Sequence, residues 1–333
     1  DLDAFSTAAI GNGPYRLADG YSYIPKEPVE LQRYEDYAGR PANVEFLTLV
    51  PYEDYSTAYN DVLAGNLDVL YPVPQERLAD LENSFPESNA QSTIPNLNFL
   101  AFPAWDPQWE NADLRYAISM AIDRETLTQT ILQGSGAPAY SMAPESAAGA
   151  RPDSCEYCTY DPEEAKRLYD AAGGYEGTLT LMTTVWGNED QVLQAIANQL
   201  KTNLGIEDIQ FELSDTAYDD FFAQTGNGVY LGYWGAYFPH IQAMVEPFYS
   251  STGANNLALY DNAEIDALIA EGDTLSGDEA IDFYNQAEDL GLAEMWYVPV
   301  YFGLYTAVWG DRVANVPMGP QGFGDLTTIE MVE

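Results

Sequence analysis

The sequence predicts an α/β protein built from two lobes. Strand and helix patterns alternate along the chain instead of forming separate runs, and this alternation is typical of α/β folds. The chain has 333 residues, of which 46% are hydrophobic, which is more than one small core uses. No run of 18 or more apolar residues occurs, so no membrane-spanning helix is expected.

The first hundred residues predict short strands around one helix. A helix is expected over 52–65, because apolar side chains recur at helical spacing and Gly65 follows them as a helix-ending residue. Strand patterns precede and follow this helix, and the strand-helix-strand order predicts an α/β lobe. The expected strands are 13–17, 29–37, 44–49, 67–73 and 94–105.

The middle of the chain has the clearest helix signals. Over 111–134 apolar residues recur at helical spacing, with a break expected at Asp123 and Arg124. Asp161 is the predicted N-cap of the next helix, with Pro162 at its first position. Strands at 178–186, 206–215 and 228–237 then alternate with helices at 192–204 and 217–226, followed by helices at 262–275 and 277–294 and a strand at 295–310.

Charge excludes one large class of function. The chain has 53 acidic and 12 basic residues, a net charge of −41, and such a surface repels phosphate backbones, so no nucleic-acid partner is expected. The acids are spread over many helical segments. This spread favours a solvated exterior over an acidic patch for a specific cationic partner.

The two cysteines, Cys155 and Cys158, lie in a loop rich in Pro, Asp and Ser before a helix. A metal site would need two more ligands, and His240, the one histidine, is distant in sequence. A redox CxxC normally opens a helix directly after a strand. A short structural disulfide in an oxidising compartment is therefore favoured over metal binding and redox chemistry.

Five blocks follow one another along the chain: "IGNGPYRL" (10–17), "RYEDYAGRPANVEFLTLV" (33–50), "LAGNLDVL" (63–70), "NADLRYAISMAIDRETLTQTILQGSGAPA" (111–139) and "YDPEEAKRLYDAAG" (160–173). In this order they resemble blocks of the extracellular solute-binding proteins of ABC importers, in the oligopeptide/dipeptide/nickel-binding class (family 5). Further along, 233–239, 255–269 and 298–302 fall where that family has its cleft strand, an N-x-s-x-Y block and its return strand.

The resemblance implies a two-lobe, periplasmic-binding-protein-like fold of type II that closes on a solute. It covers the C-terminal portion of the family, so one lobe is expected to be partial and the other complete. The implied division is 1–97 as partial lobe I, 98–303 as lobe II, and 304–333 as the return to lobe I. Two crossing strands, near 97–102 and 298–305, form the implied hinge.

The resemblance also implies the role of the protein. A small solute, peptide-like or another small polar or aromatic molecule, is captured and passed to a membrane permease, without catalysis and without a cofactor or metal. The implied protein is a monomer outside the cell, anchored at the surface through an N-terminal lipoprotein segment that this chain does not include.

The stretch "YWGAYFPH" (233–240) is the main candidate for ligand contact. In peptide-binding members the matching block reads W-x-A-D-Y, and its Asp captures the peptide amino group; here Tyr237 takes the Asp position and Phe238 the Tyr position. A tyrosine offers a neutral hydroxyl or a ring face. Sugars, ring-bearing metabolites or a backbone-held peptide suit this wall better. The alternative is that the rings pack within lobe II. The expected contacts here are Tyr233, Trp234, Gly235, Tyr237, Phe238 and His240.

Two candidates lie elsewhere in the sequence. Trp186 is the last residue of the predicted strand 178–186, at the carboxyl end where α/β lobes bind ligands. Asn98 lies in the first crossing strand, from which its amide side chain is expected to extend into the cleft. The alternative is that this amide makes hydrogen bonds within the hinge. His240 has a structural role as its alternative, since a nickel site would need partners that the sequence lacks.

Enzyme motifs are missing from the sequence. It contains no G-x-S-x-G elbow, no Gly-rich phosphate loop and no histidine next to a serine. Acidic pairs such as Asp219/Asp220 and Glu163/Glu164 arise by chance in so acidic a chain. An extracellular carbohydrate-active enzyme or glycan-binding surface protein is the remaining alternative, and it would need two convergent carboxylates or an exposed aromatic stretch.

Overall fold

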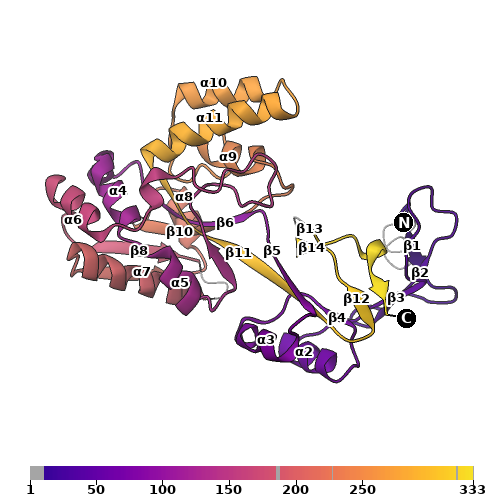
Figure 1. Ribbon diagram of the computed structural model, residues 1–333. Coiled ribbons are helices and arrows are strands. Elements are labelled where there is room, and N and C mark those ends of the chain that lie inside the picture. Colours follow the sequence, from indigo (N-terminus) through magenta and orange to yellow (C-terminus); the bar gives the residue numbers. More distant parts are fainter. Residues whose placement is uncertain (1–10, 185–187, 227, 320–321, 333) are drawn as a thin grey trace. The chain divides into compact units, whose positions relative to one another are not determined.

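The computed structural model describes residues 11–184, 188–226, 228–319 and 322–332. The chain divides into two compact units. The segments of each unit can be located in Figure 1 by their colours, which follow the sequence. Unit 1 comprises Asp1–Ser92 and Tyr305–Glu333, and unit 2 comprises Thr93–Leu304. The chain thus passes between units at 92/93 and 304/305, against sequence-based boundaries of 97/98 and 303/304. The assignment of these units to lobes stays a prediction.

Unit 1 contains a three-stranded antiparallel sheet in the order β1-β2-β3. Its strand β4 pairs instead with the C-terminal part of β11, where Leu70 lies opposite Val308. The strands before and after helix α2 therefore belong to different pairings, and the strand-helix-strand pattern here is not a parallel βαβ unit. The strands are β1 Tyr15–Leu17, β2 Val29–Arg33, β3 Phe46–Leu49, β4 Val69–Leu70, β5 Asn89–Thr93, β12 Val313–Asn315, β13 Met318–Gly319, β14 Gly322–Phe323 and β15 Glu330–Met331.

Helix α2 carries one face of the unit 1 core. The Asp54 side chain caps it by accepting from the Ser56 N–H, and Gly65 follows it with φ of 74°. Tyr59 and Val62 of the helix pack into the core against Val308 and neighbouring apolar side chains. The helices of unit 1 are α2 Tyr55–Leu63, α3 Leu81–Ser84, and the 3₁₀ turns η1 Gln75–Asp80 and η4 Leu326–Thr328.

Unit 2 is built on a mixed sheet in the order β11-β6-β10-β8-β9, with β7 also paired to β11. Strand β6 is buried along its whole length and runs antiparallel to both neighbours. Strand β8 runs parallel to β9 and β10, with helices between them in sequence, so the predicted alternation forms a true α/β unit. The strands are β6 Asn96–Ala101, β7 Gly136–Pro138, β8 Leu179–Thr183, β9 Ile209–Leu213, β10 Val229–Gly235 and β11 Tyr297–Trp309.

Several helices of unit 2 begin at a residue whose polar side chain caps the first turn. Asp123 caps α5 at the predicted break, and Asp161 caps α6 by accepting from the Glu164 N–H. Helices α10 and α11 lie side by side in Figure 1. The helices are α4 Ala112–Met120, α5 Arg124–Thr130, α6 Pro162–Ala171, α7 Glu189–Leu204, α8 Ala217–Phe222, α9 Gln242–Tyr249, α10 Ala263–Gly272, α11 Asp278–Glu294, and the 3₁₀ turns η2 Pro107–Glu110 and η3 Glu156–Cys158.

Two further features concern the predicted class of protein. Cys155 and Cys158 are joined by a disulfide at the η3 turn, with their Cα atoms 5.4 Å apart. Over the described ranges, no helix has the length and apolar character needed to cross a membrane.

Candidate ligand site

Three strands of the unit 2 sheet bring two tyrosines and an asparagine into one row. Asn98 of β6 lies directly opposite Tyr233 of β10 on one side and Tyr301 of β11 on the other. Residues opposite each other in antiparallel strands point to the same face of a sheet, so all three side chains share one face. Asn98 and Tyr301 are each 6% exposed, whereas Tyr233 is 58% exposed. Tyr233 is therefore the member of this row whose side chain is accessible to solvent.

The end of β10 and the turn after it present large rings to solvent. Tyr237 is 87% exposed and Phe238 is 45% exposed, in addition to Tyr233. Gly235 lies close to the Tyr233 ring, since a Cβ placed there would be 3.1 Å from the tyrosine hydroxyl. Three exposed rings within six residues are unusual for a soluble surface and are typical of a recognition surface.

Trp234, between these rings in sequence, has a different environment. Its indole Nε1 donates to the Ala243 carbonyl at 2.8 Å, and its ring meets Phe248 edge-on at a centroid distance of 6.0 Å. The indole also packs against the main core of unit 2. These contacts favour a structural role for Trp234, and its contact with a ligand stays a prediction.

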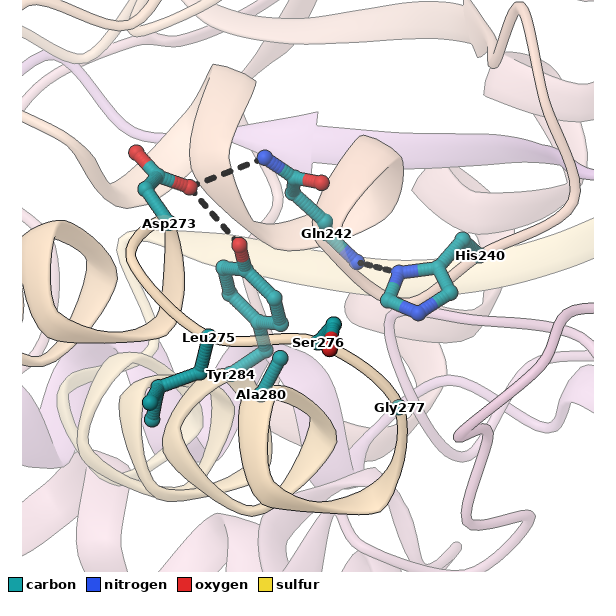
Figure 2. Close-up of a pocket in the computed structure, with 8 residues that line it drawn as sticks. All are labelled: His240, Gln242, Asp273, Leu275, Ser276, Gly277, Ala280 and Tyr284. Atoms are coloured by element: carbon teal, nitrogen blue, oxygen red, sulfur yellow. Dashed lines mark hydrogen bonds between the residues drawn. The ribbon is translucent and has the colours of Figure 1, made fainter.

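His240 lies in a separate small cavity of about 280 Å³, drawn in Figure 2. Its Nδ1 accepts from the Gln242 backbone N–H at 3.2 Å, and its ring meets Tyr284 edge-on at 5.9 Å. Burial lowers the pKa of His240. Figure 2 also shows Asp273 accepting from the Gln242 amide and the Tyr284 hydroxyl. The cavity is lined by His240, Gln242, Asp273, Leu275, Ser276, Gly277, Ala280 and Tyr284.

The rings at the end of β10 do not line the His240 cavity. The six neighbouring candidates therefore divide into three exposed rings, a glycine close to the Tyr233 ring, a packed tryptophan and a pocket histidine. No group of three or more His, Cys, Asp or Glu suited to a metal ion occurs within the described residues, so the structure offers His240 no metal-binding partners there. Trp186 lies outside the described residues.

Glu189, the first residue of α7, acts on this part of the sheet and was not singled out from the sequence. Burial and, after it, the Glu189 charge raise the pKa of Tyr301. The same carboxylate contributes to the raised pKa of Tyr230, which burial dominates. Glu189 therefore lies within electrostatic range of the face that carries Asn98. An acid in the first turn of a helix that follows a strand was the available signal.

Unit 1 has a larger cavity, of about 700 Å³, which the sequence did not predict. Its lining is mainly apolar and includes Phe46, Leu49 and Tyr55, whose side chains are also well exposed. Thr48, Asn66 and Asp68 supply polar groups along its wall. The cavity lies within unit 1 alone and includes none of the predicted ligand contacts.

Comparison with known proteins shows the family to which this chain is related. The profile of bacterial extracellular solute-binding proteins, family 5 (middle part), matches residues 1–256. The heme-binding protein A of Haemophilus influenzae is 24% identical over 96% of this chain and 59% of its own length. The periplasmic murein peptide-binding protein MppA of Escherichia coli is 27% identical, over 88% of this chain and 55% of MppA. The chain thus spans less than two thirds of these relatives.

Solved structures show the same fold. The unliganded open form of MppA superposes with a TM-score of 0.85 at 23% identity, covering 98% of this chain and 64% of that one. The Haemophilus influenzae OppA complex with the peptide RPPGFSPFR has a TM-score of 0.68 at 23% identity, over 99% of this chain and 67% of OppA. The predicted two-lobe, periplasmic-binding-protein-like fold class is confirmed by these matches.

Proposed function

Because the chain belongs to the bacterial extracellular solute-binding proteins of family 5, we propose that it comes from the substrate-binding component of an ABC importer. The protein captures a solute outside the cell and delivers it to a membrane permease. The observation that carries this proposal is the family match over 1–256, joined to a fold that is shared along 98% of the chain with a murein peptide-binding protein.

In this proposal unit 2 is lobe II, and the row of Tyr233, Asn98 and Tyr301 belongs to its ligand-binding face. The exposed rings of Tyr237 and Phe238 extend that face. Exposure supports these contacts, because a ring that a soluble protein leaves in water gains free energy when a ligand covers it. Trp234 supports the face from beneath, and Trp186 remains a candidate from the sequence alone.

The ligands that appear in the names of related proteins narrow the range of candidate solutes. Heme, murein peptides, glutathione and peptides occur in the names of the matching proteins. We propose a small, peptide-like or ring-bearing solute, an extracellular location with a lipid anchor, and a monomeric protein that performs no catalysis. The carbohydrate-active alternative from the sequence has no support in these comparisons.

A ligand panel tests the proposal on the protein as its host makes it. The panel consists of tripeptides, glutathione and heme, and the readouts are thermal unfolding and tryptophan fluorescence. A ligand at 100 times its Kd stabilises the folded state by about 2.7 kcal/mol, so at least one class should raise the melting temperature by several degrees. A panel in which neither readout responds to any member contradicts the proposal.

A further inference from the structure

We propose that the solute bound at the aromatic face of unit 2 is a cation, with an ammonium or guanidinium group beside an apolar body. This inference rests on the proposed solute-binding function and names the chemical class of its ligand. The aromatic face is the name used here for the exposed rings of Tyr233, Tyr237 and Phe238 at the end of β10. Asn98 lies opposite Tyr233 in the sheet, and Glu189 lies within electrostatic range of Tyr301.

The basic side chains of unit 2 all have partners within the unit, and none of these partners is one of the exposed rings at the end of β10. Arg124 is 1% exposed and donates to the carbonyls of Pro299 and Cys158. Arg115 is 3% exposed, and its guanidinium stacks over the Trp296 ring at 3.9 Å. The remaining four form ion pairs with acids of the helices or nearby loops: Arg151 with Glu288 and Asp289, Lys166 with Asp170, Arg167 with Glu164, and Lys201 with Glu207.

Unit 2 therefore has no uncommitted basic group that could neutralise an anionic ligand. All its lysines and arginines are among the described residues, so this statement covers the whole unit. A carboxylate or phosphate held at the face would lose its hydration without gaining a cationic partner from unit 2. An anionic solute is thus disfavoured on this side.

One acidic group acts on this face. Glu189 lies within electrostatic range of Tyr301, which lies opposite Asn98 in the sheet. No basic residue is among the charges that act on Tyr301. The electrostatic field at Tyr301 is therefore negative, and it has the same sign as the net charge of −41 on the whole chain.

The exposed rings are the second feature that favours a cationic ligand. The face of a tyrosine or phenylalanine ring attracts a cation within about 6 Å of its centroid through the ring quadrupole, and it repels an anion. Tyr233 and Tyr237, at 58% and 87% exposed, offer large ring areas to a ligand. Rings, a nearby carboxylate and no free base together select a cation that also carries apolar surface.

A competition experiment tests this selectivity. The intact protein is equilibrated with an equimolar set of blocked tripeptides, acetyl-Gly-X-Phe-amide, in which X is Lys, Arg, Gln, Met, Glu or Asp, and bound peptides are quantified by mass spectrometry. We expect Lys and Arg peptides to be enriched at least tenfold over Glu and Asp peptides. Binding without charge preference, or enrichment of the acidic peptides, overturns the inference and leaves solute binding intact. No bound peptide at all contradicts both.

A charge variant distinguishes the effect of the Glu189 carboxylate on charge preference from the effect of the net charge of the protein. Glu189→Gln should lower the ratio of bound Lys peptide to bound Gln peptide by threefold or more. Glu163→Gln, which removes the same charge from the exposed surface of α6, should leave that ratio unchanged. An equal fall in both variants would assign the preference to the net charge of the protein and overturn the local site.

Discussion

Arg151 and Glu288 form an ion pair in which only the acid is fully buried. The Arg151 Nη2 lies 2.8 Å from Glu288 Oε2, and the Glu288 side chain is 0% exposed whereas that of Arg151 is 36% exposed. The other carboxylate oxygen accepts from the Met142 N–H at 3.0 Å. Burial raises the pKa of Glu288, and Arg151 and the Met142 N–H oppose that rise. Arg151 thus supplies the positive charge that this buried carboxylate needs.

Removing the arginine should destabilise unit 2. Arg151→Ala leaves a buried carboxylate without its cation, which we expect to cost about 3 kcal/mol in the free energy of unfolding. Urea unfolding followed by circular dichroism measures it. Arg167→Ala is the matched control, because its pair with Glu164 is exposed on both sides and should cost about 0.5 kcal/mol. Equal losses in the two variants would contradict the assigned role of Arg151.

The loss of stability caused by Arg151→Ala should depend on pH. Without Arg151 the folded-state pKa of Glu288 rises further above its unfolded value. A carboxyl with a raised folded pKa contributes stability that is present below the unfolded pKa and is lost as pH rises through the folded pKa. The loss caused by Arg151→Ala should therefore be larger at pH 8 than at pH 5. Unfolding curves at both pH values measure it, and a loss that is equal or greater at pH 5 would contradict this sign.

The exposed rings should contribute directly to ligand affinity. Tyr233→Ala and Tyr237→Ala each remove a ring that is mostly in water, so we expect little change in stability and a five- to tenfold weaker Kd, equivalent to about 1 to 1.4 kcal/mol. Titration calorimetry with whichever panel ligand binds measures this change. Tyr160→Ala is the control, since Tyr160 is 43% exposed and lies outside the face. Unchanged affinity in both site variants would remove these rings from the site.

Local signals in the sequence predicted many elements well. The cap at Asp161, the break at Asp123 and the left-handed Gly65 after α2 all depend on residues a few positions apart, so a single segment contains the whole signal. The family assignment and the two-lobe fold class are confirmed by comparison. The predicted strand, helix and strand around α2 are present as β3, α2 and β4. Their pairing was not evident from the sequence, because β4 pairs with the distant strand β11.

The arrangement of the candidate site was harder to predict for the same reason. Tyr233, Asn98 and Tyr301 are far apart in sequence and meet only through the pairing of β10, β6 and β11. Helix α9 was missed because Pro247 lies inside it and its residues are apolar on most sides, which hides helical periodicity. His240 was grouped with its sequence neighbours, yet its pocket is completed by α11 through Tyr284.

The disulfide should stabilise the protein modestly without taking part in function. Cys155 and Cys158 close a loop of about four residues, for which loop-closure entropy gives about 2 kcal/mol. The double variant Cys155→Ala with Cys158→Ala should lose about that much stability and keep the ligand affinity unchanged. Urea unfolding of wild type with and without dithiothreitol gives an independent value. A large loss of affinity with intact stability would point instead to a functional role.

Arg124 should be difficult to replace, because it is 1% exposed and its five hydrogen bonds all go to uncharged groups. Its guanidinium donates to the carbonyls of Pro299, Ser119, Ile122 and Cys158 and to the Ser119 hydroxyl. Burial lowers the pKa of Arg124 to about 10, which still leaves it charged at pH 7.

Substitution of Arg124 leaves several buried carbonyls without donors, each at about 1 to 3 kcal/mol. Arg124→Lys keeps the charge but lacks the planar fork of five N–H groups, so it should satisfy fewer carbonyls and lose most of that stability. We expect both Arg124→Lys and Arg124→Met to lower the free energy of unfolding by more than about 3 kcal/mol. If Arg124→Lys unfolds like wild type in urea, then charge alone holds this junction of α5, β11 and the disulfide loop, and the hydrogen-bond geometry does not.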